Sequence, residues 1–380
     1  MNERLNRLSP AKSVIIADKA RKLKAEGHDI ALLQTGDPGF DTPEYIQQAA
    51  AQAMADGQTH YCTSTGLPLL KEVIVANYLS RFGVKVPIDS VFIGNGAVQL
   101  IYAILHTLLS PDDEVLIPLP AWPQYANIVS LAGGRPRMVD CTVETMAVEL
   151  EALVTPQTKA ILLNSPVNPT GCVVPESQRQ ALLEIAERND IYILCDEVYN
   201  RIHYLHDSPS MLASGDVLDS DYFVYINSFS KYHCMTGWRV GYAFIPADLR
   251  LGVTVFIQHT TTCSNPFSQH GAIAAMRDES DHQPFFDAML DTYAARRAAL
   301  IEGFAAKGID YYNPDGAFYM FVACAGDAET FCQHLLSEHG IAVVPGTAYG
   351  SPFSGYYRIS YSVQEAHLQR YLQWINDHGS

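Results

Sequence analysis

The sequence predicts an α/β protein in which a large domain, built on a doubly wound and mainly parallel sheet, is followed by a smaller α+β domain. Two observations lead to this prediction. Short apolar runs alternate with helical patterns from about residue 91 to residue 245, as in sheets whose strands are joined by crossover helices. Beyond residue 317 the pattern changes to short strands between helices, which is typical of a small α+β unit.

The large domain is expected to contain the following strands and helices. Four apolar runs are expected to be buried strands, at residues 91–93, 160–163, 191–195 and 222–226. Helices are expected at 97–109 and at 176–189, the second with an acidic residue in its first turn, where the helix dipole favours it.

The remaining elements belong to the C-terminal third of the chain. A long helical region is expected after residue 269, broken at Pro284 and continued over 286–306. Short strands are expected at 317–322, 341–344 and 357–361.

Composition limits the possible classes of function. The chain has 380 residues with 48% hydrophobic content, which is ordinary for a globular protein long enough for two domains. A formal charge of −16 argues against nucleic-acid binding. No stretch has the length of a membrane span, and residues 1–12 are polar without an apolar signal core, so we expect a cytoplasmic protein.

Histidines and cysteines do not form metal-binding patterns. The thirteen histidines are scattered, and none forms an H-x-x-x-H pair accompanied by carboxylates, so no metal site is expected. The eight cysteines contain no C-x-x-C pair, which favours free thiols in a reducing compartment.

Three polar clusters each follow an apolar run, where an open α/β sheet binds its ligands. They are the segment from Asn164 to Gly171, the Asp-Glu-Val-Tyr run that begins at Asp196, and the Ser-Phe-Ser-Lys run that ends at Lys231. A lysine attacks a carbonyl only as the neutral amine, so a catalytic lysine needs neighbours that lower its pKa. Arg239 is expected to do this and to bind a phosphate, which together predict a site for a phosphorylated aldehyde.

In this order, the three clusters resemble those of the aspartate aminotransferase superfamily, the fold-type I enzymes that use pyridoxal 5'-phosphate (PLP). The resemblance covers nearly the whole chain. It implies that the N-terminal segment completes the C-terminal unit, so that the small α+β domain is discontinuous. The expected division is a large PLP-binding domain at 46–274 and a small domain at 1–45 and 275–380, with the cofactor between them.

The resemblance also implies roles for individual residues. Lys231 is similar to the lysine that binds the cofactor and later moves the proton, and Asp196 to the carboxylate that pairs with the pyridine nitrogen. Tyr199 and Asn168 are similar to the residues that hydrogen-bond the phenolic oxygen. Trp122 is similar to the aromatic residue that stacks on the ring.

The two ends of the expected site bind anions. The phosphate is expected to contact Ser228, Ser230, Arg239, Tyr61 and the helix start formed by Gly96, Ala97 and Val98. The substrate is expected to contact Gly36, Trp122, Asn168 and Arg358, with Arg358 binding the α-carboxylate. Tyr61 lies on a segment that, in the superfamily, reaches the cofactor of the neighbouring subunit, so a homodimer with shared active sites is implied.

The implied activity is transfer of an amino group from an L-amino acid to a 2-oxo acid by a ping-pong mechanism. Val98 occupies the place where some aspartate-specific relatives have a lysine, which favours a neutral, aromatic or specialised substrate over aspartate. A PLP-dependent lyase or cyclase remains an alternative, because these enzymes use the same cofactor residues. A non-catalytic regulator is a weaker alternative, since such relatives carry an N-terminal helix-turn-helix domain and fewer than forty residues precede Gly36.

Overall fold

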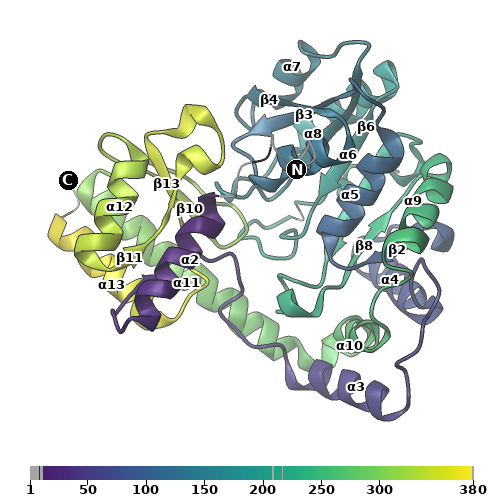
Figure 1. The fold of residues 1–380 in the computed structure, drawn as a ribbon, viewed down its shortest axis with the longest axis horizontal. Coiled ribbons are helices and arrows are strands. Elements are labelled where there is room, and N and C mark those ends of the chain that lie inside the picture. Colours follow the sequence, from purple (N-terminus) through teal and green to yellow (C-terminus); the bar gives the residue numbers. More distant parts are fainter. Residues whose placement is uncertain (1–7, 9–11, 208, 216, 379–380) are drawn as a thin grey trace.

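A seven-stranded sheet forms the centre of the large domain in the computed structural model, which describes residues 8, 12–207, 209–215 and 217–378 (Figure 1). The strand order is β2-β8-β7-β6-β5-β3-β4. The strands are β2 (Val91–Gly94), β3 (Glu114–Leu119), β4 (Arg135–Asp140), β5 (Thr158–Asn164), β6 (Tyr192–Asp196), β7 (Phe223–Ser228) and β8 (Gly241–Phe244). β8 pairs antiparallel with β2 and β7, and the other pairs are parallel, which confirms the predicted fold class.

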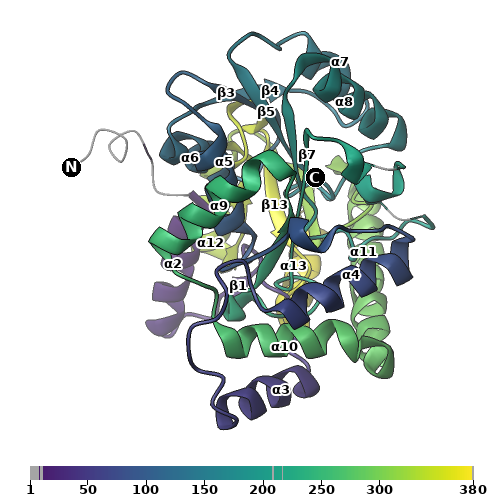
Figure 2. The ribbon, with the colours of Figure 1, turned by 90° about the vertical axis from the view of Figure 1, so that its right-hand side faces the viewer.

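Helices cover both faces of this sheet, as Figures 1 and 2 show from two sides. One face packs against α5 (Ala97–Leu108), α6 (Gln124–Ala132) and α9 (Ala247–Thr260). The other packs against α4 (Pro68–Phe82), α7 (Met146–Glu151), α8 (Glu176–Asn189) and α10 (Pro266–Arg277), with α3 (Glu44–Ala55) lying against α10. In β5, Ile161 packs on one face of the sheet and Leu162 on the other. Because helices cover both faces, both side chains are buried, which explains the continuous apolar run of this strand.

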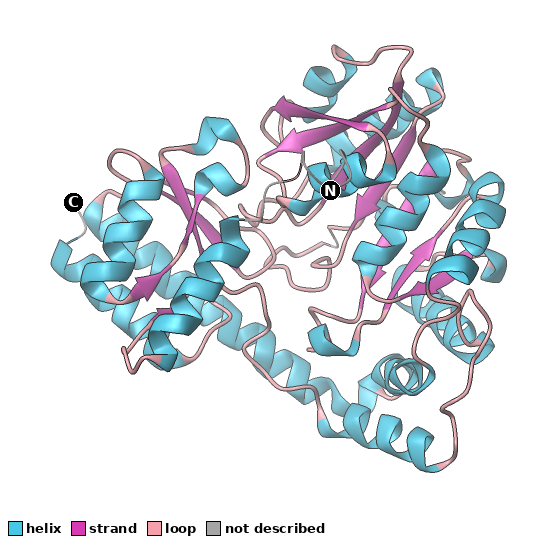
Figure 3. Ribbon diagram, in the orientation of Figure 1, coloured by secondary structure: helices cyan, strands magenta, loops and turns pink. Residues whose placement is uncertain are grey.

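The smaller domain contains an antiparallel sheet with the order β12-β13-β10-β9, seen on the left in Figure 3. Its strands are β9 (Tyr311–Tyr312), β10 (Tyr319–Ala323), β12 (Val344–Pro345) and β13 (Tyr356–Ser360). Around it lie α2 (Lys12–Ala25), α11 (Gln283–Lys307), α12 (Ala328–His339) and α13 (Glu365–His378). β1 (Ala31–Leu32) pairs in parallel with β11 (Ile341–Ala342), so the N-terminal segment joins the C-terminal unit.

The predicted elements agree with the structure apart from two details. Each predicted strand of the large domain lies within two residues of its observed bounds, and the helix predicted at 176–189 coincides with α8. The prediction of one strand at 341–344 is wrong, because β11 and β12 belong to different sheets. The predicted domain boundaries themselves stay a prediction.

The predicted break in the helical region is present, but it lies a few residues before Pro284. α10 ends at Arg277, a 3-10 turn η5 (Glu279–His282) follows, and α11 begins at Gln283 with Pro284 in its first turn. The first N–H groups of a helix have no intrahelical acceptor, so proline is tolerated there and favours the start of a helix.

Other predictions from the sequence concern the N-terminal stretch, membrane-spanning helices, metal sites and cysteines. Residues 1–7 and 9–11 of the polar N-terminal stretch lie outside the described part. Within the described part, no helix is long and apolar enough to cross a membrane. The same residues contain no group of three or more His, Cys, Asp and Glu side chains that could hold a metal. All eight cysteines are free thiols.

Candidate active site

A cleft of about 350 Å³ opens at the carboxyl ends of β5, β6 and β7. All of the predicted site residues except Gly96 and Tyr61 line it. They are Gly36, Ala97, Val98, Trp122, Asn168, Asp196, Tyr199, Ser228, Ser230, Lys231, Arg239 and Arg358. The residues come from both parts of the chain, because Gly36 follows β1 and Arg358 lies in β13, whereas the others belong to the large domain.

Lys231 follows β7 and points into this cleft, where its Nζ donates a hydrogen bond to the backbone oxygen of Gly36 at 2.6 Å. Burial is the main cause that lowers the pKa of Lys231 to about 8, and Asp37 opposes it. Arg239 lowers this pKa as predicted, but burial and Arg358 lower it more strongly. A neutral amine is therefore accessible near neutral pH.

Asp196 ends β6 and is 4% exposed. Burial raises the pKa of this carboxyl to about 6, and a hydrogen bond from Tyr125 opposes the rise. The Tyr125 hydroxyl donates to Oδ2 of Asp196 at 2.7 Å, and the N–H of Val198 donates to Oδ1 at 3.3 Å. Asp196 is thus mainly an anion at neutral pH.

A second pair of contacts joins the two domains across the cleft. The hydroxyls of Tyr199 and Tyr319 lie 2.8 Å apart. Arg358 donates to Oδ1 of Asn168 at 3.1 Å and to the backbone oxygen of Gln34 at 2.6 Å, while its guanidinium lies 4.3 Å from the centre of the Tyr319 ring. The predicted residues Tyr199, Asn168 and Arg358 are therefore brought together by a tyrosine of β10.

Arg358 is a buried cation without a carboxylate partner among the described residues. Its side chain is 4% exposed, and its Nε has no hydrogen-bond partner in that same set. A guanidinium buried in this way is costly unless an anion accompanies it. The cleft thus offers a planar, two-pronged donor suited to a carboxylate.

The opposite end of the cleft is arranged around the N-terminus of α5. Gly96 precedes the helix with a φ of 83°, and a Cβ at this position would lie 2.5 Å from Nη2 of Arg239. A Cβ at Gly241 would lie 2.5 Å from the backbone nitrogen of Ala97. Gly96 therefore allows the Arg239 guanidinium, and Gly241 the backbone of β8, to lie close to the start of the helix. Ser228 donates to the Ser230 hydroxyl at 2.7 Å beside them.

This donor set fits a phosphate. A helix N-terminus presents N–H groups and the positive end of a dipole, and a guanidinium adds a fixed charge. Arg239 itself donates to the backbone oxygen of Thr236 at 2.7 Å and has no ion-pair partner in the described part of the chain. The anionic ligand expected from the sequence thus has a complementary set of donors.

Comparison with known proteins agrees with this geometry. The family model for aminotransferase class I and II matches residues 28–375. The chain is 33% identical to the aspartate aminotransferase of Thermotoga maritima over 99% of this chain and 98% of that protein. It is 32% identical to the aspartate/prephenate aminotransferase of Thermus thermophilus over 98% of this chain and 97% of that protein.

The chain belongs to the class I and II aminotransferases.

A solved structure of a family member also agrees with the fold. The aspartate aminotransferase from Thermus thermophilus with maleate superposes on 98% of each chain with a TM-score of 0.91 and 31% identity. The prediction of a PLP-dependent transaminase of fold type I is confirmed.

Two tyrosines that line the site of this aminotransferase were not predicted from the sequence. Tyr125 lies three residues after Trp122, and their rings meet edge to face at 5.2 Å, so its spacing from Trp122 was an available signal. Tyr319 lies in the apolar strand β10, where an aromatic residue is ordinary core, so no local signal marked it.

Tyr61 is placed differently from the other predicted residues. Its side chain is 84% exposed and lines a shallow depression with Asn95 and Thr261 instead of the cleft. Its predicted contact with phosphate therefore depends on a second subunit.

Proposed function

We propose that this aminotransferase binds PLP in the cleft and uses Lys231 to exchange amino groups between an L-amino acid and a 2-oxo acid. The observation that carries the proposal is the pairing of Lys231 with Arg358. A buried lysine with a lowered pKa and a buried guanidinium without a carboxylate face the same cleft. An α-amino acid has the two groups that match them.

Three sets of residues would bind the cofactor. Ser228, Ser230, Arg239 and the N-terminus of α5 would bind the phosphate. Asp196 would face the pyridine nitrogen, with Trp122 against the ring, and Tyr199 and Asn168 would hydrogen-bond the phenolic oxygen. PLP, when bound, supplies an electron sink for the bond broken at the substrate Cα.

The protein's own part in the reaction is to hold the substrate and to move one proton. Arg358 would bind the α-carboxylate and fix the direction of the Cα–H bond. Lys231 Nζ would accept the Cα proton as a neutral amine and then donate it from the same atom. Tyr125 keeps Asp196 ionised by lowering its pKa against the effect of burial.

Two candidate substrate classes follow from different observations. The relatives above are named aspartate or aspartate/prephenate aminotransferases, which favours aspartate. We propose a neutral, aromatic or specialised amino acid instead, because Val98 lines the cleft and the lining cations, Lys231, Arg239 and Arg358, already have roles. Asp37, which also lines the cleft, would repel a second carboxylate.

A substrate panel tests both the reaction and this preference. Single turnovers of the PLP-loaded protein with individual amino acids should convert the cofactor to pyridoxamine phosphate, fastest with neutral or aromatic substrates. Val98→Lys should raise kcat/KM for aspartate relative to these by about tenfold, since a new ion pair contributes about 1.4 kcal/mol. Val98→Leu is the matched control, because it keeps the site apolar.

The other outcomes of this panel are also informative. Turnover that returns the cofactor as PLP would contradict transamination and favour a lyase or cyclase. An unmodified protein that prefers aspartate, with no gain in Val98→Lys, would contradict the proposed preference.

We also propose that the active unit is a homodimer, with Tyr61 completing the phosphate site of its partner. Light scattering should give twice the chain mass of 41.9 kDa. Tyr61→Phe removes one hydroxyl donor and should weaken PLP retention by about tenfold without changing the mass. A fully active monomer would contradict both statements. The cytoplasmic location stays a prediction from the sequence.

A further inference from the structure

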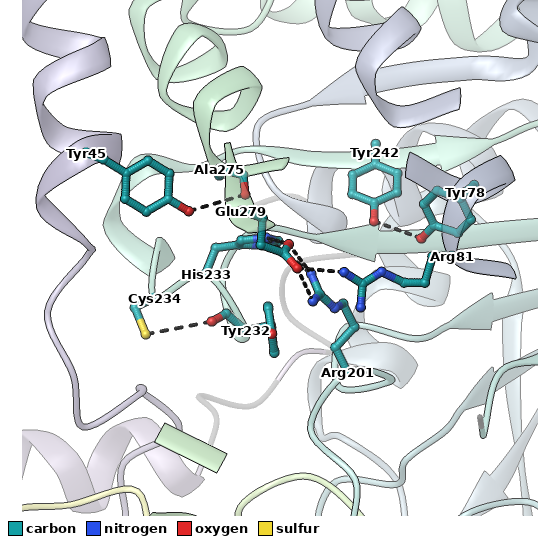
Figure 4. A network of polar contacts seen from close by, with 10 residues as sticks. All are labelled: Tyr45, Tyr78, Arg81, Arg201, Tyr232, His233, Cys234, Tyr242, Ala275 and Glu279. Atoms are coloured by element: carbon teal, nitrogen blue, oxygen red, sulfur yellow. Dashed lines mark hydrogen bonds and ion pairs between the residues drawn. The ribbon is translucent and has the colours of Figure 1, made fainter. Parts of the chain in front are cut away.

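A buried carboxylate outside the cleft binds three cationic or aromatic side chains from separate segments (Figure 4). Glu279 lies in η5, between α10 and α11, and is 3% exposed. Arg201 donates to both of its oxygens at 2.6 Å, Arg81 donates to Oε1 at 2.6 Å, and Nε2 of His233 lies 3.2 Å from Oε2. We call these four residues the Glu279 cluster.

The Glu279 cluster connects the two active-site segments to one point. Arg201 lies two residues after Tyr199, and His233 lies two residues after Lys231. Both side chains contact the carboxylate at the junction between α10, which packs on the large sheet, and α11, which packs in the small domain. Arg81 comes from α4, which carries no predicted site residue.

Tyr232 adds a second link at the same place. The Arg201 guanidinium lies 3.5 Å from the centre of the Tyr232 ring. The same ring stacks on Phe286 of α11, with centroids 4.6 Å apart and planes at 9°. The residue directly after Lys231 is therefore held between the Glu279 cluster and the small domain.

The turn after Lys231 needs such support because it is strained. Cys234 has a φ of 55°, a left-handed conformation that residues other than glycine rarely adopt. Thr42 donates to the backbone oxygen of Cys234 at 2.5 Å from one side, and the His233 contact to Glu279 fixes the turn from the other. A strained backbone persists only where its surroundings over-determine it.

We propose that Glu279 is a positioning residue that holds Lys231 and Tyr199 in the geometry of the cleft. It acts through His233 on the Lys231 turn and through Arg201 on the Tyr199 segment. The inference rests on the proposed role of Lys231 and extends it to a carboxylate outside the cleft.

The test measures how fast the apoprotein links PLP to Lys231 at pH 6 to 9.5, by visible absorption and by the mass of the borohydride-reduced Lys231 peptide. The unmodified rate should rise with pH around a midpoint near 8, as Lys231 becomes neutral. In His233→Ala the loosened turn should admit water to Nζ and move the midpoint toward the ordinary lysine value. A rise of one pKa unit would slow linkage at pH 7 about tenfold.

Direct charge effects are separated by the choice of variants. Burial lowers the pKa of His233, so its replacement removes no charge at neutral pH. Glu279→Gln removes a negative charge, which by Coulomb's law alone would lower the pKa of Lys231, whereas a loosened turn would raise it. The groups facing Lys231, Asp37, Arg358, Asp196 and Arg239, are the same in every variant.

Arg81→Gln is the matched control, because it loses a contact to the same carboxylate but joins only α4. It should keep the unmodified midpoint. The inference is overturned if His233→Ala keeps that midpoint, or if Arg81→Gln moves it as far as His233→Ala does. His233→Ala decides the question even if Glu279→Gln does not fold. An unmodified protein that links no PLP at Lys231 would overturn the proposed function together with the inference.

Discussion

Replacement of Lys231 by alanine should abolish covalent PLP binding and lower turnover by about 10⁴-fold or more, because one atom both binds the cofactor and moves the proton. Lys231 is the one lysine among the described residues that line the cleft. The measurement is the visible absorption of the PLP-loaded protein, followed by borohydride reduction and peptide mass. The unmodified protein should retain PLP on Lys231 after reduction.

Lys71→Ala is the matched control for this variant. Burial also lowers the pKa of Lys71, and its Nζ donates to Thr65 at 2.8 Å, but it lies in α4 outside the cleft. Its replacement should leave the absorption band and the adduct unchanged. A reduced PLP adduct that persists in Lys231→Ala would show that another amine binds the cofactor.

Replacement of Asp196 by asparagine should keep the shape of the site and slow Cα deprotonation by about 10²- to 10³-fold, which is typical for loss of a preorganised charge. Tyr125 can still donate to the remaining side-chain oxygen, so PLP should bind. Exchange of the substrate α-proton in D₂O, followed by NMR, measures this step. An undiminished exchange rate would refute the role proposed for Asp196.

Tyr125→Phe separates the charge of Asp196 from its hydrogen bond. The carboxylate stays, but its pKa should rise above about 6, because the Tyr125 hydrogen bond lowers it. As pH falls, Asp196 is then protonated at a higher pH than in the unmodified protein. The acid limb of the rate profile should therefore move to higher pH. A profile that matches the unmodified one would show that Tyr125 does not control the charge of Asp196.

The chemistry of the large domain was predictable because its signals are local. Asp196 and Lys231 each follow a buried apolar run, and parallel strands bring their carboxyl ends to one edge of the sheet. Once the strands are recognised, their ends must meet. The same reasoning placed Gly96 at a helix start, where the positive φ excludes most other residues.

Other features depended on segments far apart in the chain. Tyr319 reaches Tyr199 only because the small domain folds back over the sheet. The lowered pKa of Lys231 comes mainly from burial, a property of the whole fold, and Arg239 adds a smaller effect. Pro284 likewise began a helix instead of breaking one, because the chain leaves α10 at Arg277.

The sequence by itself thus determined the fold class, the strand ends and the residues expected to bind PLP, since these depend on periodicity and short motifs. Only the tertiary structure decided which groups lose water and which distant side chains meet, as in the buried guanidinium of Arg358 and the carboxylate of Glu279. The physical reason is that desolvation and long-range contacts depend on the whole packed chain, whereas strand periodicity and turn chemistry are properties of a few neighbouring residues.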